Sequence, residues 1–180
     1  MSTDDFEIVL DRDSTIPEGR ERALRRMRAI LKGYPDKVPD RANCFFYGLT
    51  KGWVLGAVIG PADADEIDDL LPPRPSGGVI EAIPFGRSPH APEVEALSED
   101  YVIDQMQSGW WFSVWMGIKN DLYFFHRNGQ EMPERSVLAW LGYLRGALEG
   151  RHISRSEYDR LRAMLPEVDD DLTPLVAATE

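Results

Sequence analysis

The sequence has few residues that could cross-link the chain through disulfides or bind a metal. It contains one cysteine in 180 residues, Cys44, so no internal disulfide can form. Its three histidines, His90, His126 and His152, do not share the close spacing of paired zinc ligands. We therefore expect neither a disulfide scaffold nor a metal centre, and the sequence indicates no cofactor.

Long hydrophobic runs are also missing. The longest apolar runs are under ten residues, whereas a helix that spans a membrane needs roughly 20. The first residues are acidic, without the basic and apolar stretches of a signal peptide. These absences predict a soluble, cytoplasmic protein.

Recognisable catalytic motifs are absent as well. There is no phosphate-binding glycine loop and no nucleophile elbow. Cys44 precedes two phenylalanines, which favours a buried thiol over a reactive one. A pair of catalytic carboxylates cannot be chosen from 31 acidic residues by sequence alone. The sequence thus gives no support for an enzymatic function, but it does not exclude one.

What the chain has in excess is negative charge, and this charge is unevenly spread. The formal net charge is −11. Residues 43–109 carry −8 and residues 167–180 carry −5, while 1–42 are neutral and 110–166 carry +2. This distribution disfavours nucleic-acid binding, which depends on basic residues. It favours a basic protein partner, unless the charge serves solubility alone.

Two apolar, aromatic-rich segments predict β-hairpins. One covers about 43–60 with Lys51-Gly52 at its turn, and the other covers about 110–127 with a turn at 119–121. A further strand is expected near 79–83. Because hairpins pair antiparallel strands, we predict an α+β fold whose antiparallel sheet is built from these segments.

Helical patterns account for much of the remaining sequence. Apolar residues at helical spacing predict four helices, at about 18–32, 94–107, 136–149 and 154–165. We identify no internal repeat and no domain boundary. The expectation is a single domain over residues 1–166, followed by an acidic and mobile tail at 167–180.

A cluster of acids after Pro61 is the first candidate site. Its members are Asp63, Asp65, Glu66, Asp68 and Asp69. A calcium loop would need a central glycine and a late glutamate, which this segment lacks. The cluster could be a solvated helix start, where the helix dipole favours acids. The second interpretation, behind the solvated helix start, is an acidic surface that faces a partner.

Two tryptophans form the second candidate site. In the predicted strand, Trp111 and Trp115 lie on one face, where either helices cover them or they anchor a partner. The runner-up hypothesis is an aromatic pocket for a small molecule, which Tyr123 and His126 would complete.

These features favour a non-catalytic, acidic protein-binding module. The most concrete version is an immunity-type inhibitor that neutralises a basic toxin or nucleic-acid enzyme, using the acids for attraction and a tryptophan as anchor. The small-molecule pocket, in a binding protein or an enzyme, remains the alternative. The segment from Leu141 to Leu161 also resembles short C-terminal helical hairpins, which implies self-association through this helix pair.

Overall fold

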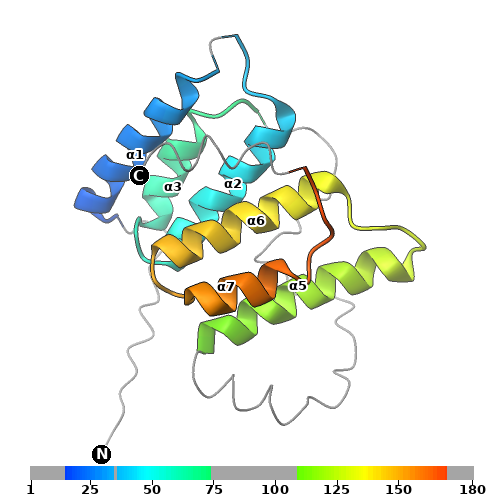
Figure 1. Cartoon of the computed structure of the whole chain (residues 1–180). Helices are drawn as coiled ribbons and strands as arrows, with labels where there is room; N and C mark the ends of the chain where they lie inside the picture. Colours follow the sequence, from blue (N-terminus) through cyan, green and yellow to red (C-terminus); the bar gives the residue numbers. More distant parts are fainter. Residues whose placement is uncertain (1–14, 35, 74–108, 170–180) are drawn as a thin grey trace, which may run out of the picture.

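The chain is helical wherever its structure is described. The computed structural model describes residues 15–34, 36–73 and 109–169. The helices of this part are α1 (Pro17–Leu31), α2 (Asp40–Leu55), α3 (Pro61–Asp68), α5 (Gly109–Arg127), α6 (Glu134–Glu149) and α7 (Arg155–Arg162). In Figure 1, α2 and α6 lie side by side at the centre, with α1 and α3 on one side and α5 and α7 on the other.

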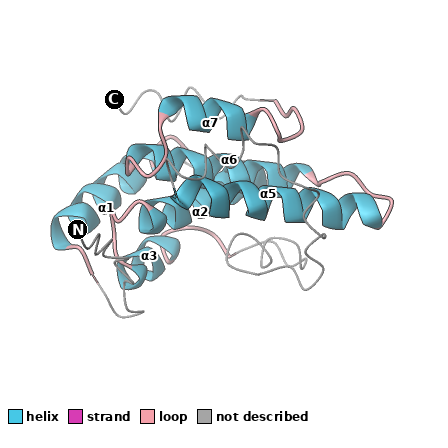
Figure 2. Cartoon of the chain, turned by 90° about the horizontal axis from the view of Figure 1, so that it is seen from below, coloured by secondary structure: helices cyan, strands magenta, loops and turns pink. Residues whose placement is uncertain are grey.

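The predicted α+β fold with an antiparallel sheet is therefore wrong. Helix α2 replaces the expected hairpin at 43–60, and helix α5 replaces the one at 110–127. The described residues contain no strand, as Figure 2 also shows. The strand expected near 79–83 falls outside these residues.

Three of the predicted helices are confirmed. Those expected at 18–32, 136–149 and 154–165 correspond to α1, α6 and α7. The helix expected at 94–107 lies outside the described residues. Pro17 opens α1 because its fixed φ suits a first helical turn. Ser154 caps α7 by accepting a hydrogen bond from the Glu157 backbone, and the Glu157 side chain accepts one from the Ser154 N–H, which together form a capping box.

The core explains why α2 was mistaken for strands. Ten of its 16 residues are buried, including Phe46, Leu49 and Trp53. A helix that is apolar on nearly all sides has no polar stripe, so its 3.6-residue period is hard to see. Cys44 is a free thiol in this core, which confirms that it is buried.

Glycines let α2 and α6 approach until their backbones touch. A Cβ added at Gly48 would overlap the Ala139 carbonyl, and one at Gly146 would lie 2.5 Å from the Leu49 carbonyl oxygen. Helices usually pack 8–10 Å apart because side chains separate them. Here that separation is lost, and the two central helices form one tightly joined pair.

The described helices contain no candidate membrane span. None of them combines the length and the apolar character that crossing a bilayer requires.

Candidate functional site

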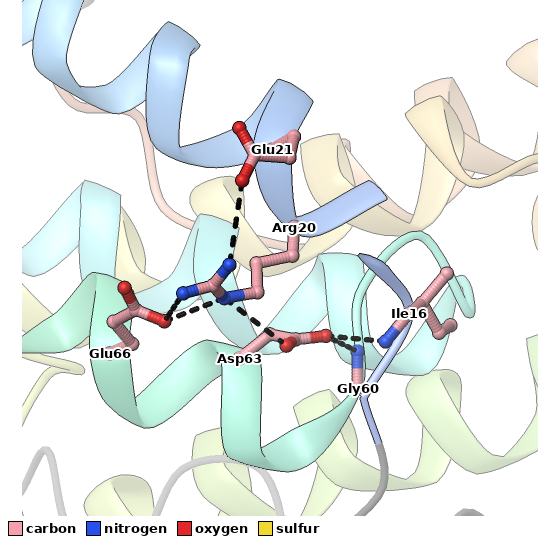
Figure 3. A network of polar contacts seen from close by, with 6 residues as sticks. All are labelled: Ile16, Arg20, Glu21, Gly60, Asp63 and Glu66. Carbon is pink, nitrogen blue, oxygen red and sulfur yellow. Dashed lines mark hydrogen bonds and ion pairs between the residues drawn. The ribbon is translucent and has the colours of Figure 1, made fainter. Parts of the chain in front are cut away.

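Asp63, in the predicted acidic cluster, is a structural residue. Its side chain is buried, with 1% of the residue exposed. Its Oδ2 accepts hydrogen bonds from the backbone N–H of Gly60 at 2.8 Å and of Ile16 at 2.7 Å. Asp63 therefore caps the start of α3 and ties it to the residue that precedes α1, as Figure 3 shows.

Glu66 is engaged within the chain as well. The Arg20 guanidinium donates from Nη2 and Nε to the Glu66 Oε2, at 2.6 and 2.7 Å. Arg20 Nε also lies 3.8 Å from Asp63 Oδ1 (Figure 3), within ion-pair range. The hydrogen bond to Glu66 raises the pKa of Arg20. This arginine from α1 thus compensates the charge of the inner acids of α3.

Asp68 faces α2. Its Oδ2 lies 3.1 Å from the Nζ of Lys51, and both side chains are less than one-fifth exposed. The same Lys51 ammonium lies 5.3 Å from the centre of the Tyr47 ring. Asp68 is therefore paired with a cation of its own chain.

Asp65 and Asp69 are the remaining acids of the cluster, and both are exposed. They are four residues apart, so they lie on the same face of the helix and its C-terminal cap. The structure gives neither side chain a hydrogen bond or ion pair with another described residue, although the Asp69 backbone N–H donates to the Asp65 carbonyl at the end of the helix. The structure thus reduces a five-residue acidic surface to an exposed pair.

The described residues carry no excess charge. They contain 17 acidic and 17 basic side chains, whereas the whole chain has 31 acids and 20 bases. The surplus of −11 therefore belongs to residues 1–14, 74–108 and 170–180. Within residues 43–109, the described part contributes about half of the predicted negative block, through α3 and Lys51.

The tryptophans do not share a strand face, because they belong to helix α5. Trp115 is half-buried, and the Lys119 ammonium lies 5.2 Å from the centre of its ring. The side chain of Trp111 lies outside the described part. In Figures 1 and 2, helices α3 and α5 lie apart, on opposite sides of the α2–α6 pair.

The predicted aromatic pocket has no counterpart among the described residues. Tyr123 is 39% exposed, and His126 also faces solvent. An open hollow of about 620 Å³ lies instead at the α6–α7 turn, where its wall includes Arg151, His152 and Arg155. Burial lowers the pKa of His152 there.

A buried carboxylate that the sequence did not indicate joins three helices. Glu149 of α6 accepts two hydrogen bonds from Arg26 of α1, at 2.6 and 3.0 Å. It accepts further ones from Trp53 Nε1 at 2.7 Å and from Arg145 Nε at 2.9 Å. Burial alone would raise the pKa of Glu149, but these hydrogen bonds hold it below its ordinary value. The four-residue spacing of Arg145 and Glu149 was the only part of this arrangement visible in the sequence.

A second, partly buried carboxylate joins α5 to α6. Asp121 Oδ2 accepts a hydrogen bond from Trp140 Nε1 at 2.8 Å. No cation pairs with it among the described residues, and burial raises its pKa to about 6 although the hydrogen bond opposes this shift. Asp121 was predicted as part of a hairpin turn, which concealed its position between α5 and α6.

No group of three or more metal-ligating side chains gathers within the described ranges. Comparison with known proteins gives no match to a family model, a curated protein or a solved structure.

Proposed function

We propose that this chain is a non-catalytic module that binds a basic protein in the cytoplasm, as an immunity-type inhibitor of a toxin or nucleic-acid enzyme does. The observation that carries the proposal is the exposed pair Asp65 and Asp69 on α3. Asp63, Glu66 and Asp68 are committed to contacts that hold α1, α2 and α3 together. The exposed pair makes no such contact, so its charge is available to a partner.

Electrostatics supports this choice of partner. Exposed acids attract a basic surface over about a Debye length and thereby speed the encounter. The other acids of α3 have their charges offset by Arg20 and Lys51. Asp65 and Asp69 thus contribute the negative potential around α3. The net charge of −11 of the whole chain also attracts a basic partner.

The experiment compares three tagged baits in lysate of the native source at low and high salt. They are the wild-type chain, the Asp65→Lys/Asp69→Lys variant, and the control Asp36→Lys/Glu131→Lys. The control makes the same change in net charge at exposed acids on other loops. We expect the wild type and the control to retain the same basic protein, more strongly at low salt.

The retained protein is then purified for rate and activity measurements. The α3 variant should associate with it several-fold more slowly than the control does. Addition of the wild-type chain should inhibit the enzymatic or toxic activity of the retained protein. Equal rates for the two variants, or a retained protein whose activity is unaffected, would contradict the proposal.

A further inference from the structure

Two segments of the chain share a sequence pattern, although no internal repeat was expected. Residues 39–72 and 133–166 align without a gap at an offset of 94, with nine of 34 positions identical. The identical pairs are Pro39/Pro133, Arg41/Arg135, Gly48/Gly142, Gly52/Gly146, Gly56/Gly150, Ile59/Ile153, Asp65/Asp159, Leu71/Leu165 and Pro72/Pro166.

The first helix of each segment has the same boundaries at this offset. Helices α2 and α6 each have 16 residues and follow a proline cap, with φ and ψ of −59° and 146° at Pro39 and −62° and 145° at Pro133. A glycine caps the C-terminus of each. The next residue has a positive φ in both, 49° at Ala57 and 59° at Arg151. Non-glycine residues rarely adopt this conformation, so its recurrence at equivalent positions is a specific match.

The second helices match as well. Helices α3 and α7 each have eight residues. The acid at their third position accepts a hydrogen bond from the capping backbone N–H, at 2.8 Å from Gly60 to Asp63 and at 2.7 Å from Ser154 to Glu157. Each helix also ends in the same pair of backbone hydrogen bonds at equivalent residues. The two segments are thus the same helix–turn–helix unit.

The two units pack together reciprocally. Gly48 faces the Ala139 carbonyl, and its equivalent Gly142 faces the carbonyl of Phe45, which is the equivalent of Ala139. The same exchange relates the contacts of Gly52 with Tyr143 and of Gly146 with Leu49, and Gly56 meets Gly150 directly. Residue i contacting j while j contacts i is the mark of a twofold interface. Because contacts advance together along both helices, α2 and α6 run parallel.

We infer that the chain is a fused dimer, in which each unit is the binding partner of the other. A preceding helix, α1 or α5, extends each unit. The units meet through the glycine faces of α2 and α6, which allow the two backbones to approach each other closely. The inference predicts that the covalent connection between them, residues 74–108, is not needed to hold the folded units together.

The differences between the units bear on the proposed function. Glu66 and Asp68 of α3 are replaced by Arg160 and Arg162 at the equivalent positions of α7. The unit therefore folds with either charge at these positions. These two acids pair with Arg20 and Lys51 in the first unit. Of the exposed pair, Asp65 recurs as Asp159, whereas Asp69 is replaced by Ala163, so the complete pair is present in the first unit alone.

The test cuts the full-length chain after folding. A protease site is placed within residues 74–108 and cleaved under native conditions. We expect the fragments to co-elute at the mass of the uncut chain and to keep its helical circular dichroism spectrum. Fragments that separate or unfold after the cut would overturn the inference.

Equivalence of the two glycine faces is tested in the same cut protein. Gly52→Ala and Gly146→Ala each place a Cβ against backbone of the other unit. Each should weaken fragment association by about 10- to 100-fold, and by comparable factors, because both overpack one symmetric contact. The control Ala29→Leu, at an exposed position on α1, should leave association unchanged. Tolerance of one glycine substitution but not the other would contradict a twofold interface.

Discussion

At the scale of single residues, the pKa values of two partly buried carboxylates are shifted in opposite directions. Glu149 is surrounded by donors from Arg26, Arg145 and Trp53, so its ionised form is stabilised. Asp121 accepts a hydrogen bond from Trp140 and pairs with no cation among the described residues, so burial disfavours its ionised form. The folded state therefore gains from ionisation at one site and loses from it at the other.

Replacing Glu149 by glutamine should be costly at neutral pH. The change leaves Arg26 and Arg145 partly buried without their counter-charge, and we expect a loss of about 3 kcal/mol in unfolding free energy. Since the folded-state pKa of Glu149 is lowered, its stabilising effect is present above its unfolded pKa and is lost as pH falls through the folded one. Denaturant unfolding of the wild type and Glu149→Gln at pH 7 and pH 3 measures both effects.

The matched control is Glu134→Gln, on the same helix. Glu134 pairs with Arg41 at 2.8 Å, but its side chain is 51% exposed, against 18% for Glu149. Solvent screens such a pair, so its removal should cost less than about 1 kcal/mol. Equal costs for the two variants would mean that Glu149 is not the buried centre described above.

Asp121 should give stability that falls as pH rises. With a folded pKa of about 6 against 3.8 for the free group, the folded state binds a proton between these values that the unfolded state does not. Unfolding free energy should therefore be higher below pH 4 and decline through pH 6, by up to about 3 kcal/mol from this group. Asp121→Asn keeps an acceptor for Trp140 and should abolish that component. The measurement is the difference in unfolding free energy between Asp121→Asn and wild type, taken at pH 4.5 and again at pH 7.5. For the control Glu131→Gln, at an exposed position, this difference should change by less than about 0.5 kcal/mol between the two pH values.

At the scale of elements, α5 is where sequence and structure differ most instructively. Its aromatic and β-branched residues favoured strands, and Lys119 to Asp121 read as a hairpin turn. In the structure these residues continue one helix, which places Val114, Ile118 and Phe125 in the core while Tyr123 and Phe124 are exposed. Tertiary packing decided the conformation, and β propensity is too weak a preference to resist it.

The burial of α5 can be tested directly. Ile118 is fully buried, so Ile118→Ala should cost about 2–4 kcal/mol by losing apolar contacts and leaving a cavity. Phe124 is 41% exposed, and Phe124→Ala should cost less than about 1 kcal/mol. Urea unfolding compares the two variants. A larger cost at Phe124 would be inconsistent with the helical face described here.

The amphipathic helices were predictable from sequence, and the central one was not. Helices α1, α6 and α7 have clear start signals and periodic apolar residues, such as Pro17 and the capping box at Ser154. Gly52 was assigned to a hairpin turn and Gly48 and Gly56 to its strands, although the spacing of four places all three glycines on one helical face. The same spacing at 142, 146 and 150 was the available signal, and it would have revealed both the helix and the duplication.

The candidate site was predictable only in part. The sequence located the acidic cluster, but all five acids look alike without knowledge of their neighbours. Arg20 and Lys51 approach α3 from other helices, 46 and 17 residues away from their partners. Only the folded chain separates Asp65 and Asp69 from the structural acids.

At the scale of the whole molecule, the balance of charge predicts little dependence of stability on salt. The described residues, helices and loops together, have equal numbers of acids and bases, so self-repulsion among them is small. Unfolding free energy should change by less than about 1 kcal/mol between roughly 50 and 500 mM NaCl. Exposed ion pairs such as Lys37–Asp40 and Arg155–Asp159 contribute little, and salt screens the more buried pairs only weakly. Urea titration at the two salt concentrations measures it. A large gain at high salt would show that the acidic surplus of the chain acts against the folded helices.

The direct backbone contact between α2 and α6 also has a consequence for motion. Where side chains separate helices, small rotamer changes let the helices slide, but carbonyls packed against glycine Cα atoms have no such freedom. The central pair should therefore move as one rigid body, and local opening should be confined to the surrounding helices. In native-state hydrogen exchange, the amides of α2 and α6 would then exchange last, together, and only through complete unfolding of the chain.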